Sequence, residues 1–297
     1  MSKEASMEYI LRKGETTAVA SASGGELVSF SRSGTEYIWQ GDPAVWPGRN
    51  PILFPVIGNL RNGTAQIQGK SCSMKRHGFA RDMQWSLLEL SEDSITMELR
   101  ENETSLDMYP FAFSLRVTHL LHENGFSTCF HIENLSNTDM PFCIGGHTAF
   151  NCPLRKGESF EDYSLIFERP ETARTVLFTS EGLISDSPGE YVLNGDDRLK
   201  LAYEYFRRLD TIAFTKLVSR RVSLINSRTG KGLCMDFHDF PIIAFWTKPG
   251  APFLCLEPWM GCSDRETSSG KFEDKDNILL LKPEKSTEFS FSISIIE

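Results

Sequence analysis

Near its C-terminal end the chain reads Phe289-Ser290-Phe291-Ser292-Ile293-Ser294-Ile295, in which large apolar residues alternate with serines. Successive side chains of a β-strand point to opposite faces, so this period of two is typical of a half-buried strand. A turn signal, Glu123-Asn124-Gly125, stands between two further apolar runs. We therefore expect a β-hairpin with strands over residues 115–121 and 126–133.

Short strand candidates separated by Gly, Pro and Asn occur along the rest of the chain, at residues 26–31, 64–68, 85–90, 94–100, 221–226 and 234–237. Helical periodicity is weak, and only the segment from Arg265 onward hints at a short helix or loop. His119 and His122 have a helical spacing, but the alternation around them favours strand positions. Because there is no composition break, repeat or linker, the sequence predicts one all-β sandwich domain over residues 1–297.

The charge balance excludes one class of partner. The 31 basic and 40 acidic residues give a net charge of -9, and no run of Lys or Arg marks a nucleic-acid-binding surface. No apolar run approaches the roughly 20 residues that a bilayer span needs, so we expect no membrane partner. The first nine residues include Glu4 and Glu8 where a signal peptide would be apolar, which favours a cytoplasmic location.

The seven cysteines form no Cys-x-x-Cys pair and are odd in number, which favours reduced thiols and gives no indication of zinc. The three Asn-x-Ser/Thr matches, at Asn62, Asn102 and Asn134, are interpreted as chance matches to a short pattern. The common nucleotide-binding, serine-hydrolase and zinc-protease motifs are absent from the sequence.

Three segments combine ionisable residues with glycine and aromatic residues, as a sugar-holding groove requires: residues 76–82, 145–151 and 256–261. With other blocks they form an ordered set that resembles the aldose 1-epimerase (galactose mutarotase) superfamily, in particular its LacX-like branch. The blocks are residues 37–43, 51–55, 77–82 (His-Gly-Phe-Ala-Arg-Asp), 109–111, 141–147 (Pro-Phe-Cys-Ile-Gly-Gly-His), 246–250 and 257–259 (Glu-Pro-Trp).

The resemblance implies a β-supersandwich of the galactose mutarotase type that interconverts the α and β anomers of an aldose without metal or organic cofactor. It implies that Glu257 is the general base and His147 the general acid, since ring opening needs both groups beside the anomeric carbon and ring oxygen. His77 and Asp210 match family positions that hold the sugar. The expected partner is a monosaccharide, and the expected assembly is a monomer or homodimer.

One family position differs in this chain. Where the family has a substrate-binding arginine, the spacing to Gly63 places Asn59. Arg61 shares a strand face with it and is one possible replacement, and Arg81 is another. This departure leaves the preferred sugar open. A phosphorylated sugar would need clustered basic residues, for which Arg61, Arg76 and Arg81 are the candidates.

Two alternative functions stay open at this point. The same groove could serve a carbohydrate-binding protein without catalysis, although binding alone would not require both proton-transfer groups. A carbohydrate hydrolase or lyase on a related sandwich would normally need a second carboxylate, for which Asp210 is the candidate. Trp246 and Trp259 are expected to be core residues.

Overall fold

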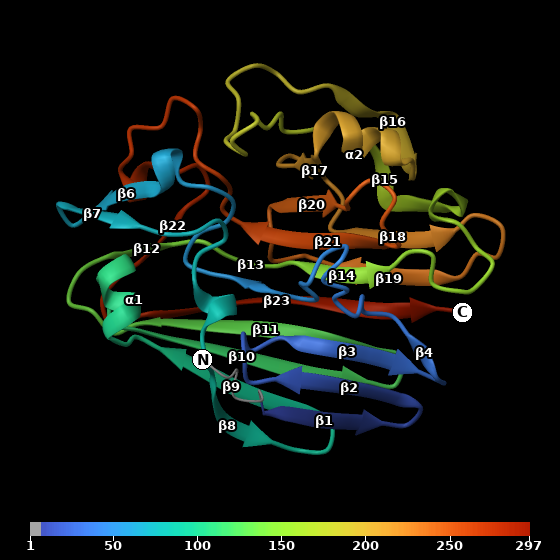
Figure 1. The fold of residues 1–297 in the computed structure, drawn as a ribbon, viewed down its shortest axis with the longest axis horizontal. Helices are drawn as coiled ribbons and strands as arrows, with labels where there is room; N and C mark the ends of the chain where they lie inside the picture. Colours follow the sequence, from blue (N-terminus) through green and yellow to red (C-terminus); the bar gives the residue numbers. More distant parts are fainter. Residues whose placement is uncertain (1–6) are drawn as a thin grey trace.

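The computed structural model describes residues 7–297, so the residues before Met7, on which part of the signal-peptide expectation rests, lie outside it. Its largest sheet is antiparallel throughout (Figure 1). In spatial order it consists of β16 (Tyr191–Lys200), β15 (Tyr163–Arg174), β18 (Arg221–Asn226), β19 (Gly232–Asp236), β23 (Ser286–Ile296), β11 (Gly125–Asn134), β10 (Phe113–His122), β9 (Ser94–Arg100) and β8 (Ser86–Leu90).

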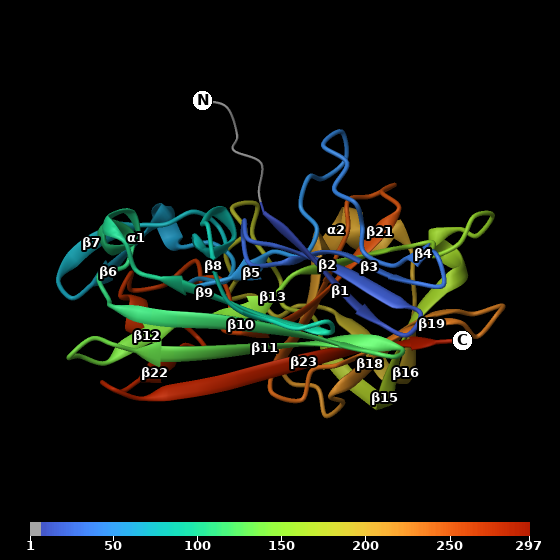
Figure 2. The ribbon, with the colours of Figure 1, turned by 90° about the horizontal axis from the view of Figure 1, so that it is seen from below.

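A second sheet carries the residues of the candidate site. Its strand order is β17 (Thr211–Phe214), β20 (Ile242–Trp246), β21 (Phe253–Met260), β13 (Ile144–Gly146) and β5 (Ile52–Leu53), and β14 (Thr148–Asn151) also pairs with β21. Figure 2 shows the long strands β10, β11 and β23 of the first sheet running side by side along the molecule.

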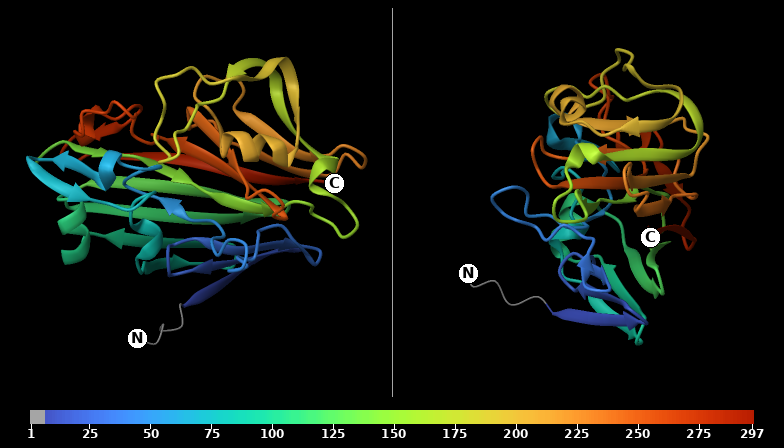
Figure 3. Two further views of the ribbon diagram at one scale, coloured as in Figure 1. Left: turned by 45° about the horizontal axis from the view of Figure 1, so that its top comes forward. Right: turned by 90° about the vertical axis from the view of Figure 1, so that its right-hand side faces the viewer.

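An N-terminal sheet and two strand pairs complete the β-structure. The sheet contains β1 (Glu8–Lys13), β2 (Thr16–Ser21), β3 (Leu27–Arg32) and β4 (Thr35–Glu36), and Figure 3 shows it, in blue, on the side of the molecule opposite to β16. The pairs are β12 (Met140–Phe142) with β22 (Leu279–Leu281), and β6 (Thr64–Ile67) with β7 (Lys70–Ser73). The helical segments are α1 (Glu103–Met108), α2 (Tyr203–Leu209), and 3-10 turns at Arg61–Gly63, Ala80–Asp82, Phe160–Asp162 and Phe272–Asp274.

The alternation in β23 is a burial pattern. Phe289, Phe291, Ile293 and Ile295 are buried, whereas the serines between them are exposed or half-buried. The predicted hairpin is confirmed, since β10 pairs with β11 across a two-residue turn. Gly125 follows that turn, and glycine is required there by strand packing, not by the turn itself. A Cβ built on Gly125 would lie 1.9 Å from the carbonyl oxygen of Ile293, so glycine allows β11 to approach β23.

The other predicted strands are confirmed as β3, β6, β8, β9, β18 and β19. Helices α1 and α2 are missing from the sequence prediction; α1 is closed at its N-terminus by reciprocal hydrogen bonds between Asn102 and Ser105. The segment after Arg265 is mainly loop before the turn at Phe272–Asp274. Within the described chain, no helix has the length and apolar character to cross a membrane.

Candidate active site

Strand register brings His147 and Glu257 face to face. Strand β13 pairs with β21 through Gly145 and Trp259, and β14 continues the same register through Thr148 and Leu256. His147 lies between β13 and β14 and is therefore opposite Glu257. Its Nε2 atom is 3.3 Å from Oε2 of Glu257, and both side chains are buried.

The glycines before His147 allow this close approach. A Cβ on Gly145 would lie 2.7 Å from the carbonyl oxygen of Pro258, and a Cβ on Gly146 would lie 3.0 Å from the ring of Phe291. Phe291 belongs to β23 in the other sheet. The Gly-Gly pair is thus explained by packing on both sides of β13, and this packing sets the position of His147.

The two residues lie in the wall of a cavity of about 130 Å³. Its lining consists of Trp46, Arg76, His77, Arg81, His147, Thr211, Trp246, Glu257 and Trp259. The ring of Trp46 stacks on His147 with centroids 5.2 Å apart, and Trp246 meets His147 edge-on at 5.8 Å. Trp246 is half-buried and part of this wall, whereas Trp259 is buried in the core as expected and also reaches the cavity.

His77 is held by a backbone loop. Its own N–H donates to the carbonyl oxygen of Gly58 (2.9 Å), and the N–H of Gly58 donates to Nδ1 of His77 (3.1 Å). The backbone of His77 has a φ of 69°, which is uncommon outside glycine. Nε of Arg76 donates to Nε2 of the same ring at 3.2 Å, so both ring nitrogens of His77 face a hydrogen-bond donor. His77 meets His147 edge-on, with ring centroids 5.5 Å apart.

Burial dominates the electrostatics of the site. It lowers the pKa of His147 to about 3, with a further lowering by Arg76. It also lowers the pKa of His77 well below its usual range, aided by His147 and Arg76. The pKa of Glu257 is raised well above its usual range by burial, although Arg76 acts in the opposite direction. Oε2 of Glu257 and Nδ1 of His147 have no hydrogen-bond partner among residues 7–297.

Asp210 lies at the edge of this site. It follows α2 and precedes Thr211 of β17, and its exposed carboxylate accepts a hydrogen bond from the Thr211 hydroxyl at 3.2 Å. Its charge contributes to the raised pKa of Glu257, which places the two carboxyl groups within electrostatic reach. The backbone angles of Asp210, φ 59° and ψ −63°, are sparsely populated and strained.

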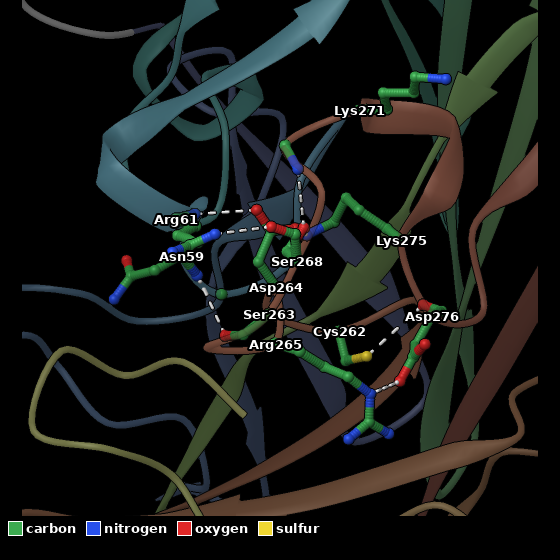
Figure 4. A network of polar contacts seen from close by, with 12 residues as sticks. Asn59, Arg61, Cys262, Ser263, Asp264, Arg265, Ser268, Lys271, Lys275 and Asp276 are labelled. Atoms are coloured by element: carbon green, nitrogen blue, oxygen red, sulfur yellow. Dashed lines mark hydrogen bonds and ion pairs between the residues drawn. The ribbon is translucent and has the colours of Figure 1, made fainter. Parts of the chain in front are cut away.

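The structure brings Arg81 to the cavity but places Asn59 and Arg61 elsewhere. Arg61 is held by Asp264 and Ser268, with its backbone N–H donating to the Asp264 carboxylate at 2.8 Å (Figure 4). The side-chain amide of Asn59 donates to the carbonyl oxygen of Glu181 at 2.6 Å. The arginine that lines the cavity near Glu257 is Arg76, directly before His77.

Sequence reasoning missed Trp46 and Thr211 as site residues, and it considered Arg76 only as a member of a possible phosphate-binding cluster. Arg76 stands in a segment that the composition singles out, so its position beside His77 was the available signal. Trp46 lies in the loop between β4 and β5, and no local pattern marks it as a partner of His147. Cys255 was also missed: its Sγ lies within 4.8 Å of donor atoms of His147 and Glu257. This donor set is the kind that binds Zn²⁺, and it overlaps the acid–base pair.

The site can move protons between neighbouring oxygen atoms of a polar ligand. A carboxyl and an imidazole stand side by side in the wall of the cavity, with two indole rings as flat walls and two arginines as donors. These groups suit a ring that carries several hydroxyls.

Comparisons with known proteins identify the family of the chain. The family model described as aldose 1-epimerase matches residues 7–259. Protein LacX, chromosomal, of Lactococcus lactis subsp. lactis is 38% identical, and the alignment covers 92% of this chain and 94% of that protein.

Solved structures share the fold. A galactose mutarotase related enzyme from Lactobacillus acidophilus superposes with a TM-score of 0.91 at 28% identity, covering 98% of both chains. A galactose mutarotase-like protein from Lactobacillus casei ATCC 334 has the same TM-score at 25% identity, covering 98% of this chain and all of that chain. The predicted all-β, galactose mutarotase-like fold is confirmed.

Proposed function

Because the chain belongs to the aldose 1-epimerase family, we propose that it is a mutarotase-like isomerase that interconverts the α and β anomers of an aldose. The observation that carries the proposal is the buried Glu257–His147 pair, with 3.3 Å between carboxylate oxygen and imidazole nitrogen. Ring opening moves one proton off the anomeric hydroxyl and one onto the ring oxygen, and these are the two groups that such a step requires.

In the proposed reaction Glu257 takes the proton from the anomeric hydroxyl while His147 gives a proton to the ring oxygen. The bond between C1 and the ring oxygen breaks, and the electron pair on the anomeric oxygen forms the aldehyde. After rotation about the C1–C2 bond the roles reverse: His147 removes the proton from the C5 hydroxyl, which attacks C1, and Glu257 returns its proton to the anomeric oxygen. All protons are conserved over one cycle.

The proposed reaction requires that Glu257 and His147 together hold one proton. In the free site burial favours the uncharged form, with Glu257 protonated and His147 neutral, as their shifted pKa values indicate. The reactive form, with an ionised Glu257 and a protonated His147, has the same number of protons. Arg76, which lowers the pKa of Glu257, stabilises the ionised carboxylate. Hydroxyl groups of a bound sugar would do the same by donating to it.

The remaining residues hold the sugar in this proposal. His77 forms part of the cavity wall beside the sugar, and the Gly58 amide at Nδ1 and Arg76 at Nε2 hold its ring in place. Asp210 accepts hydrogen bonds from hydroxyls at the cavity edge, and Arg76 takes the role of the family arginine, which the sequence had assigned to Asn59, Arg61 or Arg81. Arg81 lies at the same cavity as a second donor. Trp46 and Trp246 offer apolar faces to the sugar ring.

The alternatives fit the geometry less well. A hydrolase needs a second carboxyl across the cavity, and Glu257 is the one carboxyl among the lining residues in the described chain, with Asp210 exposed beside it. A binding protein without catalysis would not require an acid and a base in contact inside a buried wall.

The broader expectations belong to the same proposal. We retain a cytoplasmic location, in keeping with seven free cysteines. We also retain one domain over residues 1–297, since β23 near the C-terminus lies in the middle of the largest sheet. The assembly is a monomer or a homodimer.

Anomer exchange tests the proposal. Freshly dissolved α-glucose, α-galactose and other aldoses are followed by NMR or polarimetry with wild type, with Glu257→Gln and without protein. We expect acceleration by the wild type and a loss of at least about 100-fold in kcat for the variant, with sugar binding largely retained. Binding without acceleration for every sugar, or a wild-type rate in Glu257→Gln, would contradict the assignment.

A further inference from the structure

The cavity contains two arginines without acidic partners. Arg76 is exposed and Arg81 half-buried, and both line the cavity. Neither forms an ion pair within residues 7–297, which is also true of other arginines such as Arg12 and Arg49, but Arg76 and Arg81 lie together in the wall of the cavity that holds Glu257 and His147. A positive site whose charge is only partly compensated, in a chain of net charge -9, attracts an anion.

The contacts of these arginines leave most of their donors free for a ligand. An Nη atom of Arg81 donates to the carbonyl oxygen of Arg76 at 2.9 Å, and Nε of Arg76 donates to Nε2 of His77 at 3.2 Å. A guanidinium has five N–H donors in a planar fork, which matches the oxygens of a phosphate or a carboxylate. Neutral hydroxyls do not require a pair of such groups.

The carboxyl groups near Arg81, other than Glu257 of the site itself, have other partners. Asp82, beside Arg81 in the chain, forms an ion pair with Lys75 at 3.4 Å. Glu26 accepts a hydrogen bond from the Asn50 amide at 2.6 Å, and burial raises its pKa to about 7, so its countercharge near Arg81 is incomplete at neutral pH. The positive charge at the cavity is therefore only partly balanced.

The side on which the charge lies indicates where the anion would be. Nε of Arg76 contacts the ring of His77, and that ring packs edge-on against His147 with centroids 5.5 Å apart. Arg81 donates to the backbone of Arg76, and both arginines are among the charges that lower the pKa of the two histidines. Both guanidinium groups therefore lie on the imidazole side of the cavity, although the charge of Arg76 also acts on Glu257. In the proposed reaction His147 serves the ring oxygen, and in a pyranose the carbon bonded to that oxygen, C5, carries C6. The anomeric oxygen itself must be free, which excludes a 1-phosphate.

We propose that the substrate is an aldohexose with an anionic group on C6, a 6-phosphate or a 6-carboxylate, held by Arg76 and Arg81. This inference rests on the proposed function, because the position of the ring follows from the roles of Glu257 and His147.

The test compares kcat/KM for anomer exchange of glucose, glucose 6-phosphate and glucuronate, with the rate without protein subtracted for each sugar. We expect a kcat/KM at least about tenfold higher for an anionic sugar than for glucose. A gain for both anions indicates recognition of charge, and a gain for one of them identifies phosphate or carboxylate. Raising the ionic strength should reduce the gain. Equal values for glucose and both anions would overturn the inference while leaving the proposed function intact.

Four variants, one of them a control, test whether Arg76 and Arg81 cause the preference for an anionic sugar. In Arg81→Met and Arg76→Met the loss of kcat/KM on the preferred anionic sugar should be about 10- to 100-fold, and at least tenfold greater than the loss on glucose. Arg81→Lys should recover part of it. Arg61→Met, whose side chain contacts Ser268 away from the cavity, is the matched control and should retain the preference. Equal losses on charged and neutral sugars would contradict the inference.

If the proposed function is wrong, the protein will not accelerate anomer exchange of any aldose, and this result differs from equal rates on neutral and anionic sugars. The inference is then decided by calorimetric binding of glucose 6-phosphate, glucuronate and glucose. A preference for an anion that disappears in Arg81→Met supports it, and equal affinities overturn it.

Discussion

Glu257 and His147 owe their chemistry to burial. In water a carboxyl and an imidazole would titrate about two pKa units apart, with the carboxyl the stronger acid. In the cavity burial raises the pKa of Glu257 and lowers that of His147 to about 3, so the order is inverted. The proton they hold can then move to either member as the ligand changes the local field.

This inversion has a consequence for the pH dependence of the rate. The pair keeps its single proton as the pH falls from 7 to 5, because a second proton binds only near the lowered pKa of His147. We expect kcat/KM for anomer exchange, which reports the titration of the free site, to stay flat over this range after correction for the uncatalysed rate. Stopped-flow polarimetry on the folded protein measures it. A decline centred near pH 6.5, the ordinary value for histidine, would show that His147 titrates freely.

At the residue scale the sequence predicts the side chains that have a local signature. Glu257 precedes Pro-Trp and His147 follows Gly-Gly, and both reach the cavity. Arg61 was a reasonable candidate from strand periodicity, but a 3-10 turn begins at that residue, so alternation does not apply. The position of Trp46 depends on how distant loops pack, which no short pattern encodes, whereas Arg76 lies in a segment that the composition singles out.

At the scale of elements, the strand pair β13 and β21 determines the position of the acid relative to the base. Gly145 faces a backbone carbonyl, and Gly146 faces the movable ring of Phe291. The two glycines therefore differ in how well a methyl group can be accommodated.

Gly146→Ala should lower kcat by on the order of tenfold, because displacement of β13 shifts His147 relative to Glu257. Adding Phe291→Leu should restore part of the rate by making room for the new methyl group. Gly145→Ala should destabilise the protein by about 1–3 kcal/mol and should not be rescued by Phe291→Leu, since the obstacle is the oxygen of Pro258. Rates and urea unfolding midpoints measure both effects. Equal rescue of the two alanine variants would contradict this account.

Long strands with strict alternation, such as β23, were predictable because one face is buried along their whole length. Helices α1 and α2 have six and seven residues, too few turns for a helical period to emerge from the sequence. The short strands β5 and β13 of the second sheet were also not predicted; they have two and three residues, all buried, so they show no alternation.

At the scale of the whole molecule, three buried histidines couple folding to pH. His77, His119 and His147 all have pKa values lowered by burial, with that of His119 at about 4. The unfolded chain takes up protons at these residues as the pH falls below about 6.5, and the folded protein does not. The stabilisation present above that pH is therefore lost progressively on acidification.

His119 lies outside the cavity, between Thr128 and the carbonyl oxygen of Gly25, and provides the clearest measurement. Between pH 7 and pH 5 it should account for about 2 kcal/mol of the decrease in the free energy of unfolding. In His119→Gln that decrease should be smaller by this amount, as measured by urea titration at both pH values. His238→Gln, at an exposed position, is the control and should leave the decrease unchanged. An unaltered decrease in His119→Gln would disprove the coupling.

His147 and Glu257 face each other across neighbouring strands, and this arrangement also links catalysis to cooperative unfolding. Their separation is set by the same backbone hydrogen bonds that join β21 to β13 and β14. A partly unfolded protein that retains the nine-stranded sheet but has lost this ladder would contain both residues and have no activity. Loss of turnover and amide hydrogen exchange of β21 should therefore begin at the same denaturant concentration. The enzyme assay would then report the opening of β21, the middle strand of the second sheet.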